Sequence, residues 1–245
     1  MNHINTIEVK NFTKSYRGKK VIDDVSFQVK GNTIHGFIGP NGAGKSTTLN
    51  ALMSLTLADS GELLIEGKKT SSDPTFNENV GYVPAEPLFP TKMKVKEYVE
   101  FCGLLRDIPS SKVNKIFNNS SLFKLANQRC TDLSTGQKKL LQLFGIKIYQ
   151  TEFQKMIYIL DEPFNGLDPT KRSLLANEIK KIKNEGGSVL ISTHILSDLQ
   201  ELADDITMIK PEERGSRIVY TGPKTADIQK TYEQYFINEN QELFA

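Results

Sequence analysis

The feature that most constrains this chain is an eight-residue run, Gly39-Pro40-Asn41-Gly42-Ala43-Gly44-Lys45-Ser46. It matches the phosphate-binding pattern G-x-x-x-x-G-K-[S/T] at every fixed position. A short apolar stretch at 34–38 precedes it, and apolar residues at helical spacing follow it. A strand, a glycine loop and a helix in this order aim backbone N–H groups and a helix N-terminus at an anion. The run therefore predicts a nucleotide site in which Lys45 reaches the β- and γ-phosphates and Ser46 binds Mg²⁺.

Composition excludes some classes of partner. With 31 basic and 29 acidic residues the net charge is only +2, so nucleic-acid binding is not expected. The basic pairs Lys138-Lys139 and Lys180-Lys181 are predicted to be solvated helix faces.

The two cysteines, Cys102 and Cys130, lack metal-like spacing and are predicted to be free thiols in a reducing compartment. Residues 1–10 have no signal-peptide core, and no apolar run approaches the ~20 residues of a membrane span. We therefore expect a soluble, cytoplasmic protein that reaches a membrane only through a partner.

Apolar patterning divides the chain into three kinds of segment. Alternation at 7–12, 25–29 and 63–65 predicts strands of an antiparallel sheet, with Ile7, Val9 and Asn11 on one face of the first. From Pro84 to Gln150 the spacing becomes helical, which predicts a helical insertion. Its expected apolar faces are Val95, Val99, Cys102 and Leu105, then Val113, Ile116 and Phe117, and then Leu140, Leu141, Phe144 and Ile148.

The pattern of alternating strands and helices then returns. The apolar run 156–160 predicts a parallel strand buried on both faces, and it ends in Asp161 and Glu162. Asp168 and the following proline predict a helix start, and a further buried strand at 189–191 leads to His194. Segments 206–209 and 218–220 predict a hairpin, and the polar tail after 225 is expected to be helical.

The strand ends carry residues suited to phosphoryl transfer, since catalytic groups gather at the carboxyl edge of a parallel sheet. Asp161 is predicted to hold Mg²⁺, and Glu162 to take a proton from an attacking water. His194 is predicted to bind the γ-phosphate. A lone strand-end histidine is more often structural, but the matched chemistry at the other strand ends favours a functional role.

A second anion-binding surface is predicted at Leu133-Ser134-Thr135-Gly136-Gln137. Ser134 stands where the N-cap of a helix over 135–149 is expected, and the glycine leaves the helix N-terminus open. One nucleotide needs only one glycine-rich phosphate-binding loop. A second phosphate-binding segment far along the chain therefore indicates a site that is completed by another subunit. The alternative is an ordinary capped helix.

These motifs together resemble the ATP-binding cassette family, the nucleotide-binding subunits of ABC transporters, over residues 5–222 and in the family's order. Met156 to Asp161 resemble the Walker B strand, and Glu162 the catalytic glutamate. Leu133 to Gln137 resemble the LSGGQ signature, and Asn165 to Asp168 the D-loop. His194 resembles the switch histidine, and Tyr16 the aromatic residue that stacks on adenine. The residues that resemble the Walker A loop include Gly39, Asn41, Gly42, Ala43, Gly44, Lys45, Ser46 and Thr47.

The resemblance implies an α/β fold: a P-loop NTPase (RecA-like) core with a mainly parallel sheet, an antiparallel β subdomain and a helical subdomain insertion. The core would comprise 1–85 and 151–222, the helical subdomain 86–150, and the C-terminal tail 223–245. It implies ATP and Mg²⁺ as cofactors, and a homodimer or heterodimer of cassettes at the inner face of the cell membrane. Integral membrane subunits would contact a groove at about 86–101. The residues implied to grip the partner's nucleotide are Ser134, Gly136, Gln137 and Asp168.

Two positions depart from the family pattern. Thr135 replaces the first glycine of the signature, and Ala85 stands at the usual place of the glutamine-loop glutamine, with Glu86 after it. The leading interpretation is an ATPase that powers a transporter of the exporter type. The alternatives are a cassette ATPase that acts on DNA or the ribosome, and a regulatory subunit that binds ATP without hydrolysing it.

Overall fold

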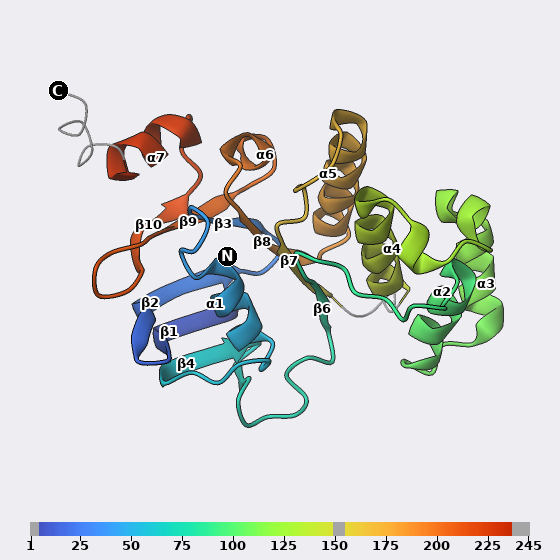
Figure 1. Ribbon diagram of the computed structural model, residues 1–245, viewed down its shortest axis with the longest axis horizontal. Coiled ribbons are helices and arrows are strands. Elements are labelled where there is room, and N and C mark those ends of the chain that lie inside the picture. Colours follow the sequence, from blue (N-terminus) through green and yellow to red (C-terminus); the bar gives the residue numbers. More distant parts are fainter. Residues whose placement is uncertain (1–4, 149–154, 237–245) are drawn as a thin grey trace.

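Two β-sheets and a separate group of helices make up the fold in the computed structural model, which describes residues 5–148 and 155–236 (Figure 1). The smaller sheet is antiparallel and has the strand order β2-β1-β4-β5. Its strands are β1 (Asn5–Tyr16), β2 (Lys19–Lys30), β4 (Ser60–Ile65) and β5 (Lys68–Lys69). The predicted antiparallel sheet is therefore confirmed.

The larger sheet has the order β10-β9-β3-β8-β7-β6, and its strands are parallel except for β10 at one edge. Every residue of β3, β7 and β8 is buried, which explains why these strands are apolar without alternation. The antiparallel β9–β10 pair is the predicted hairpin. The strands are β3 (Ile34–Ile38), β6 (Val80–Val83), β7 (Ile157–Asp161), β8 (Ser188–Thr193), β9 (Asp205–Lys210) and β10 (Arg217–Pro223).

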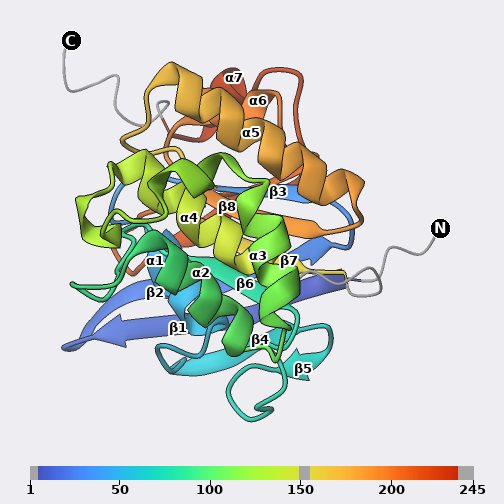
Figure 2. The same ribbon diagram turned by 90° about the vertical axis from the view of Figure 1, so that its right-hand side faces the viewer.

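Helices cover both faces of the larger sheet (Figure 2). Helix α1 (Lys45–Leu52) lies between the two sheets, where Leu49 and Leu52 join a core built from both. On the opposite face lie α5 (Pro169–Asn184), α6 (Leu196–Gln200) and α7 (Ile228–Phe236), which share a second core with β3, β7 and β8. Asp168 caps α5 as predicted, because its Oδ1 accepts a hydrogen bond from Lys171 N at 2.9 Å.

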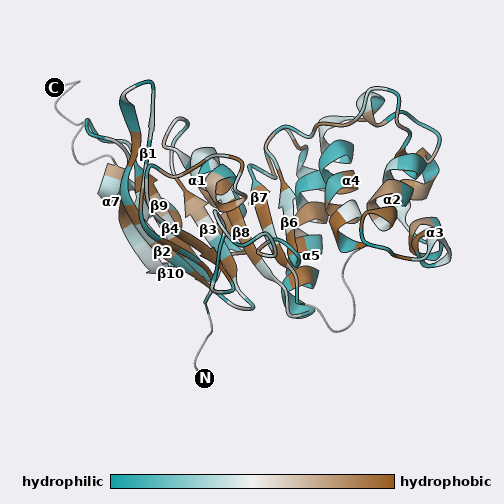
Figure 3. Cartoon of the chain, turned by 90° about the horizontal axis from the view of Figure 1, so that it is seen from below, coloured by the Kyte–Doolittle hydropathy of each residue, from teal (hydrophilic) through white to brown (hydrophobic). Residues whose placement is uncertain are grey.

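The remaining helices form a group beside the β6 edge of the larger sheet (Figure 3). They are α2 (Val95–Leu104), α3 (Ser110–Asn118) and α4 (Thr135–Lys147), with 3₁₀ turns at Ser121–Leu125 and Cys130–Asp132. They enclose a core of their own, which contains both free cysteines. Helix α4 packs tightly on β6, since a Cβ at Gly81 would lie 2.2 Å from Ile146 Cγ2.

Some predicted side-chain directions are wrong. Asn11 does not share the face of Ile7 and Val9, because a bulge gives it a φ of 50° and turns it outward to Asp24. The bulge brings Phe12 into the core instead. Leu105 is 60% exposed because α2 ends one residue before it. The predicted end of α4 at 149 and the domain boundary at 150/151 lie outside the described residues.

Candidate active site

The phosphate loop connects β3 to α1, and glycine is required at some of its positions by backbone conformation and at others by lack of space. Gly42 and Gly44 have φ values of +81° and +87°, which strongly favour glycine. A Cβ at Gly39 would lie 2.5 Å from Ile209 O. The first backbone N–H groups of α1 have no partner within the helix, and they stand at the positive end of its dipole. This cradle fits a phosphate group.

Lys45 begins α1 and points back across the loop. Its side chain is 5% exposed, and its ammonium donates to Gly39 O at 2.8 Å and to Pro40 O at 3.2 Å. The same nitrogen lies 3.3 Å from Glu162 Oε1. The loop carbonyls thus hold the lysine charge at the carboxyl edge of the sheet. Of the neighbouring loop residues, Asn41, Gly42 and Ser46 are exposed, Thr47 is half-buried and Ala43 is buried.

Glu162 lies where three segments meet. It follows β7 with a φ of 45°, and its N–H points to Ser192 of β8, 3.1 Å from both Ser192 O and Ser192 Oγ. Both carboxylate oxygens lie 3.0 Å from His194 Nδ1. Asp161, which is 2% exposed, accepts a hydrogen bond from the Ser192 hydroxyl. The structure therefore brings Lys45, Asp161, Glu162 and His194 to one edge of the sheet.

Lys139 also reaches this edge, although the sequence analysis placed it on a solvated face. That prediction is wrong for Lys139, which is 2% exposed and donates to Glu162 O and Asn165 O, and correct for Lys180 and Lys181, which are exposed. Burial lowers the pKa of Lys139, and the nearby carboxylates of Glu162 and Asp161 oppose that shift. The sequence feature that could have predicted this burial is helical spacing, since Lys139 lies on the same face of α4 as Gly136, Gln142 and Ile146, which are also buried.

The signature and D-loop residues lie apart from the phosphate loop. Ser134 is the predicted N-cap of α4: its N–H donates to Gln137 Oε1 at 3.0 Å, and its Oγ accepts from Gln137 N at 3.4 Å. Gly136 packs against the D-loop residue Leu167, because a Cβ at Gly136 would lie 2.9 Å from Leu167 Cδ2. Across the described ranges, no hydrogen bond or ion pair joins Ser134, Gln137 or Asp168 to Lys45 or Glu162.

Tyr16 and the position of the missing glutamine belong to two further segments, the end of β1 and the segment after β6. Tyr16 ends β1, is 46% exposed, and has Lys14 Nζ 5.2 Å from its ring centroid. Ala85 and Glu86 follow β6, which runs parallel to β7. They therefore leave the sheet at the same edge as Asp161.

Comparison with known proteins places these observations in one family. The family model for ABC transporters matches residues 22–165, more than half of the chain. The chain belongs to the ABC transporter family. It is 32% identical to the SkfA peptide export ATP-binding protein SkfE of Bacillus subtilis, over 83% of this chain and 85% of that one. It is 30% identical to the lantibiotic transport ATP-binding protein SrtF of Streptococcus pyogenes, over 83% and 86%.

The fold of this ABC subunit has a close counterpart among solved structures. A structure of the ATP-binding subunit of an ABC transporter matches it with a TM-score of 0.78, at 24% identity, over 94% of this chain and 95% of that one. The predicted P-loop NTPase fold, with its antiparallel sheet, is confirmed. Within the ABC family this chain is an ATP-binding subunit. In the part of the chain that the structure describes, no helix has the length and apolar character needed to cross a membrane.

Proposed function

We propose that this subunit hydrolyses ATP with Mg²⁺ and thereby powers export through separate membrane subunits. The observation that carries the proposal is the environment of the Glu162 carboxylate, which lies 3.3 Å from Lys45 Nζ and 3.0 Å from His194 Nδ1. A carboxylate between a phosphate-binding lysine and a histidine is placed to act as a general base. The names of the related subunits, which concern peptide export and lantibiotic transport, support an exporter.

Each residue at the carboxyl edge has a role in this proposal. The amides of the loop and Lys45 bind the phosphates, and Glu162 removes a proton from the attacking water. His194 orients the Glu162 carboxylate and faces the γ-phosphate. Ser46 and Asp161 offer the hard oxygen donors that Mg²⁺ prefers, and this ion would neutralise charge that develops on the phosphate oxygens. Tyr16 is proposed to stack on adenine.

The signature residues are proposed to complete the site of a second cassette. Ser134 and Gln137 stand at the N-terminus of α4, where the helix dipole favours an anion, and the buried Gly136 lets this first turn pack closely on Leu167 and Lys171. Asp168 begins the neighbouring α5 and would lie in the same interface. In a Glu162→Gln background, ATP with Mg²⁺ should produce a dimer by light scattering, and Ser134→Arg should abolish it. A dimer that forms equally well in both proteins would contradict the composite site.

The membrane partner is proposed to contact the groove at about 86–101, between the core (1–85 and 151–222) and the helical subdomain (86–150). Leu88 and Phe101, both in this segment, are 84% and 44% exposed, which suits docking of a partner segment. Such docking would place the subunit on the inner face of the cell membrane. The relatives described above favour this role over action on DNA or the ribosome.

Hydrolysis is tested by measuring phosphate release from ATP by the purified chain, with Mg²⁺ and with a chelator. We expect release that requires Mg²⁺ and is lost in Lys45→Ala. Absence of release from the complete assembly with its membrane subunits would favour the regulatory alternative instead.

A further inference from the structure

We propose that Lys139 is a positioning residue for Glu162. In this proposal its buried ammonium holds the backbone turn that carries the general base, and ties that turn to the helix that carries Ser134 and Gly136. The proposal deepens the proposed function and rests on the role of Glu162 in hydrolysis.

The geometry of the turn after β7 supports this role. Glu162 O accepts a hydrogen bond from Asn165 N at 3.2 Å and a second one from Lys139 Nζ. Lys139 Nζ also donates to Asn165 O at 3.1 Å. The ammonium of Lys139, on helix α4, is thus hydrogen-bonded to the first and the last residue of the turn, Glu162 and Asn165.

The backbone of Glu162 needs such support. Its φ of 45° is a left-handed conformation, which is unfavourable for a non-glycine residue because its Cβ comes too close to the following carbonyl oxygen. Such conformations persist where surrounding contacts over-determine them, and they gather at functional sites. Ser192 on β8 holds the N–H of Glu162, and Lys139 on α4 holds its carbonyl. The two contacts fix the direction in which the carboxylate leaves the backbone.

The charge of Lys139 points to a directional role rather than to simple packing. Lys139 is 2% exposed, and burial of its ammonium is costly unless the group is hydrogen-bonded, whereas an apolar side chain would fill the same space without that cost. Its acceptors are the Glu162 and Asn165 carbonyls, while Lys45 contacts the Glu162 carboxylate. Loss of Lys139 should therefore disturb catalysis more than nucleotide binding.

The experiment compares Lys139→Met, which removes the donors but keeps the length, with Lys138→Met. Lys138 is the matched control: it is the neighbouring residue on α4, it is half-buried, and its side chain makes no hydrogen bond or ion pair within the described residues, although its backbone N–H donates to Ser134 O within the helix. We expect Lys139→Met to lower kcat at least tenfold, with KM and the affinity for a fluorescent ATP analogue within twofold. Lys138→Met should keep kcat within twofold. A kcat for Lys139→Met within twofold of the unmodified protein would overturn the proposal.

A double-mutant cycle separates positioning from a general structural defect. If Lys139 acts through Glu162, then adding Lys139→Met to Glu162→Gln should lower single-turnover hydrolysis by less than twofold. The same tenfold loss in both backgrounds would overturn the proposal. If Lys139→Met does not fold, as judged by its melting transition, the same cycle is run with Lys139→Arg, which keeps the cation but changes its geometry.

Hydrogen exchange gives a readout that does not depend on hydrolysis. Asn165 N–H donates to Glu162 O, and Lys139 Nζ donates to the same oxygen. Without the Lys139 hydrogen bonds this turn should open more often, so Asn165 N–H should exchange at least tenfold faster in Lys139→Met than in Lys138→Met. Unchanged exchange would overturn the positioning role even if ATP is hydrolysed. Faster exchange in a protein that does not hydrolyse ATP would count against the proposed function, but it would still support the role of Lys139 in holding the turn.

Discussion

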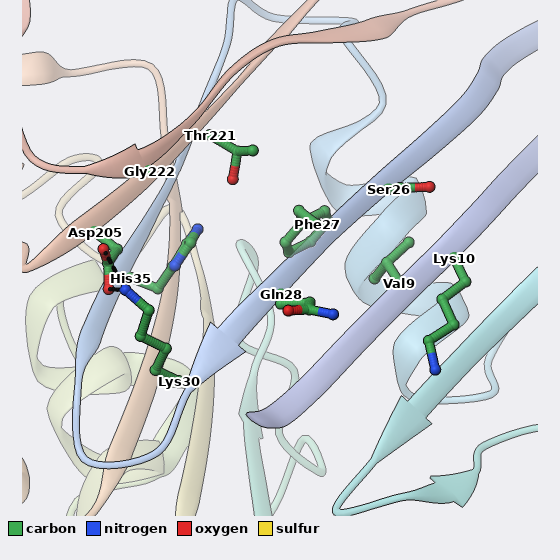
Figure 4. Close-up of a pocket in the computed structure, with 10 residues that line it drawn as sticks. All are labelled: Val9, Lys10, Ser26, Phe27, Gln28, Lys30, His35, Asp205, Thr221 and Gly222. Atoms are coloured by element: carbon green, nitrogen blue, oxygen red, sulfur yellow. Dashed lines mark hydrogen bonds and ion pairs between the residues drawn. The ribbon is translucent and has the colours of Figure 1, made fainter. Parts of the chain in front are cut away.

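The two edges of the larger sheet each bring together a lysine, a carboxylate and a histidine. At the amino edge, Lys30 Nζ lies 3.1 Å from both oxygens of Asp205, and His35, the second residue of β3, is the register partner of Asp205. These residues line a groove between the two sheets (Figure 4). At the carboxyl edge, Lys45 and His194 both contact the carboxylate of Glu162.

The difference lies in what surrounds each set. At the amino edge Lys30 and Asp205 pair with each other, and His35 Nε2 lies 2.8 Å from Thr207 Oγ1. Burial lowers the pKa of His35 to about 4, so the ring is neutral at physiological pH. At the carboxyl edge, Lys45 stands at the N-terminus of α1, and Glu162 lies in a turn with a left-handed backbone conformation. There the same residue types lie beside a helix N-terminus that favours an anion. The position relative to helix N-termini, rather than the residue types, distinguishes the candidate active site.

Removing the carboxylate at each edge should produce the largest contrast. Glu162→Gln is expected to lower turnover by about 10²–10⁴-fold, the usual cost of losing a general base, while ATP binding remains. Asp205→Asn at the amino edge should leave turnover within twofold. Phosphate release and binding of a fluorescent ATP analogue measure the two effects. Near-normal hydrolysis by Glu162→Gln would remove this residue from the mechanism.

The pH dependence of stability should report the amino-edge histidine. Above pH 6.5 His35 is neutral in both folded and unfolded chains, so it contributes no pH dependence there. As the pH falls from 6.5 towards 4, the unfolded chain binds a proton that the folded chain does not, and stability decreases. The full loss is about 3 kcal/mol, which is reached below pH 4. Urea unfolding between pH 4 and 7 should show a weaker dependence in His35→Gln. Identical slopes for the two proteins would contradict the assignment.

The two histidines should differ in their effect on turnover. His194→Ala removes a partner of the Glu162 carboxylate and is expected to lower kcat by roughly tenfold to a hundredfold, as losses of orienting groups do. His35→Gln should leave kcat within twofold, because His35 belongs to the opposite edge. Steady-state hydrolysis at pH 7.5 measures both. Equal losses in the two variants would mean that the edges are not functionally distinct.

The smallest effect is expected at the missing glutamine. Lys45, Ser46, Asp161 and Glu162 are all present, so Ala85→Gln should change basal turnover by less than about tenfold, or under ~1.4 kcal/mol of barrier. Glu86→Ala should reduce stimulation by the membrane partner more than it reduces basal activity. An assembly that gains hydrolysis only through Ala85→Gln would instead identify a degenerate site.

Much of the fold and the site could be predicted because the relevant signals are local. The phosphate loop and the caps at Ser134 and Asp168 each lie within a few residues of chain, where turn and capping preferences operate directly. Apolar runs without alternation predicted buried parallel strands. The rule that such strands end at a common edge then brought Asp161 and His194 together.

The sequence by itself determined which residues form the phosphate loop, the strand ends and the signature helix, because backbone preferences and periodicity act over short stretches. Only the tertiary structure decided that Asn11 turns outward at a bulge and that Lys139, one of two adjacent lysines, is buried against Glu162. Burial of a side chain depends on segments distant in the chain: Lys139 meets acceptors 23 and 26 residues further along. Local periodicity predicts that a helix has a buried face. It does not predict which hydrogen-bond acceptors a charged side chain will meet on that face, because those acceptors come from other elements that pack against the helix.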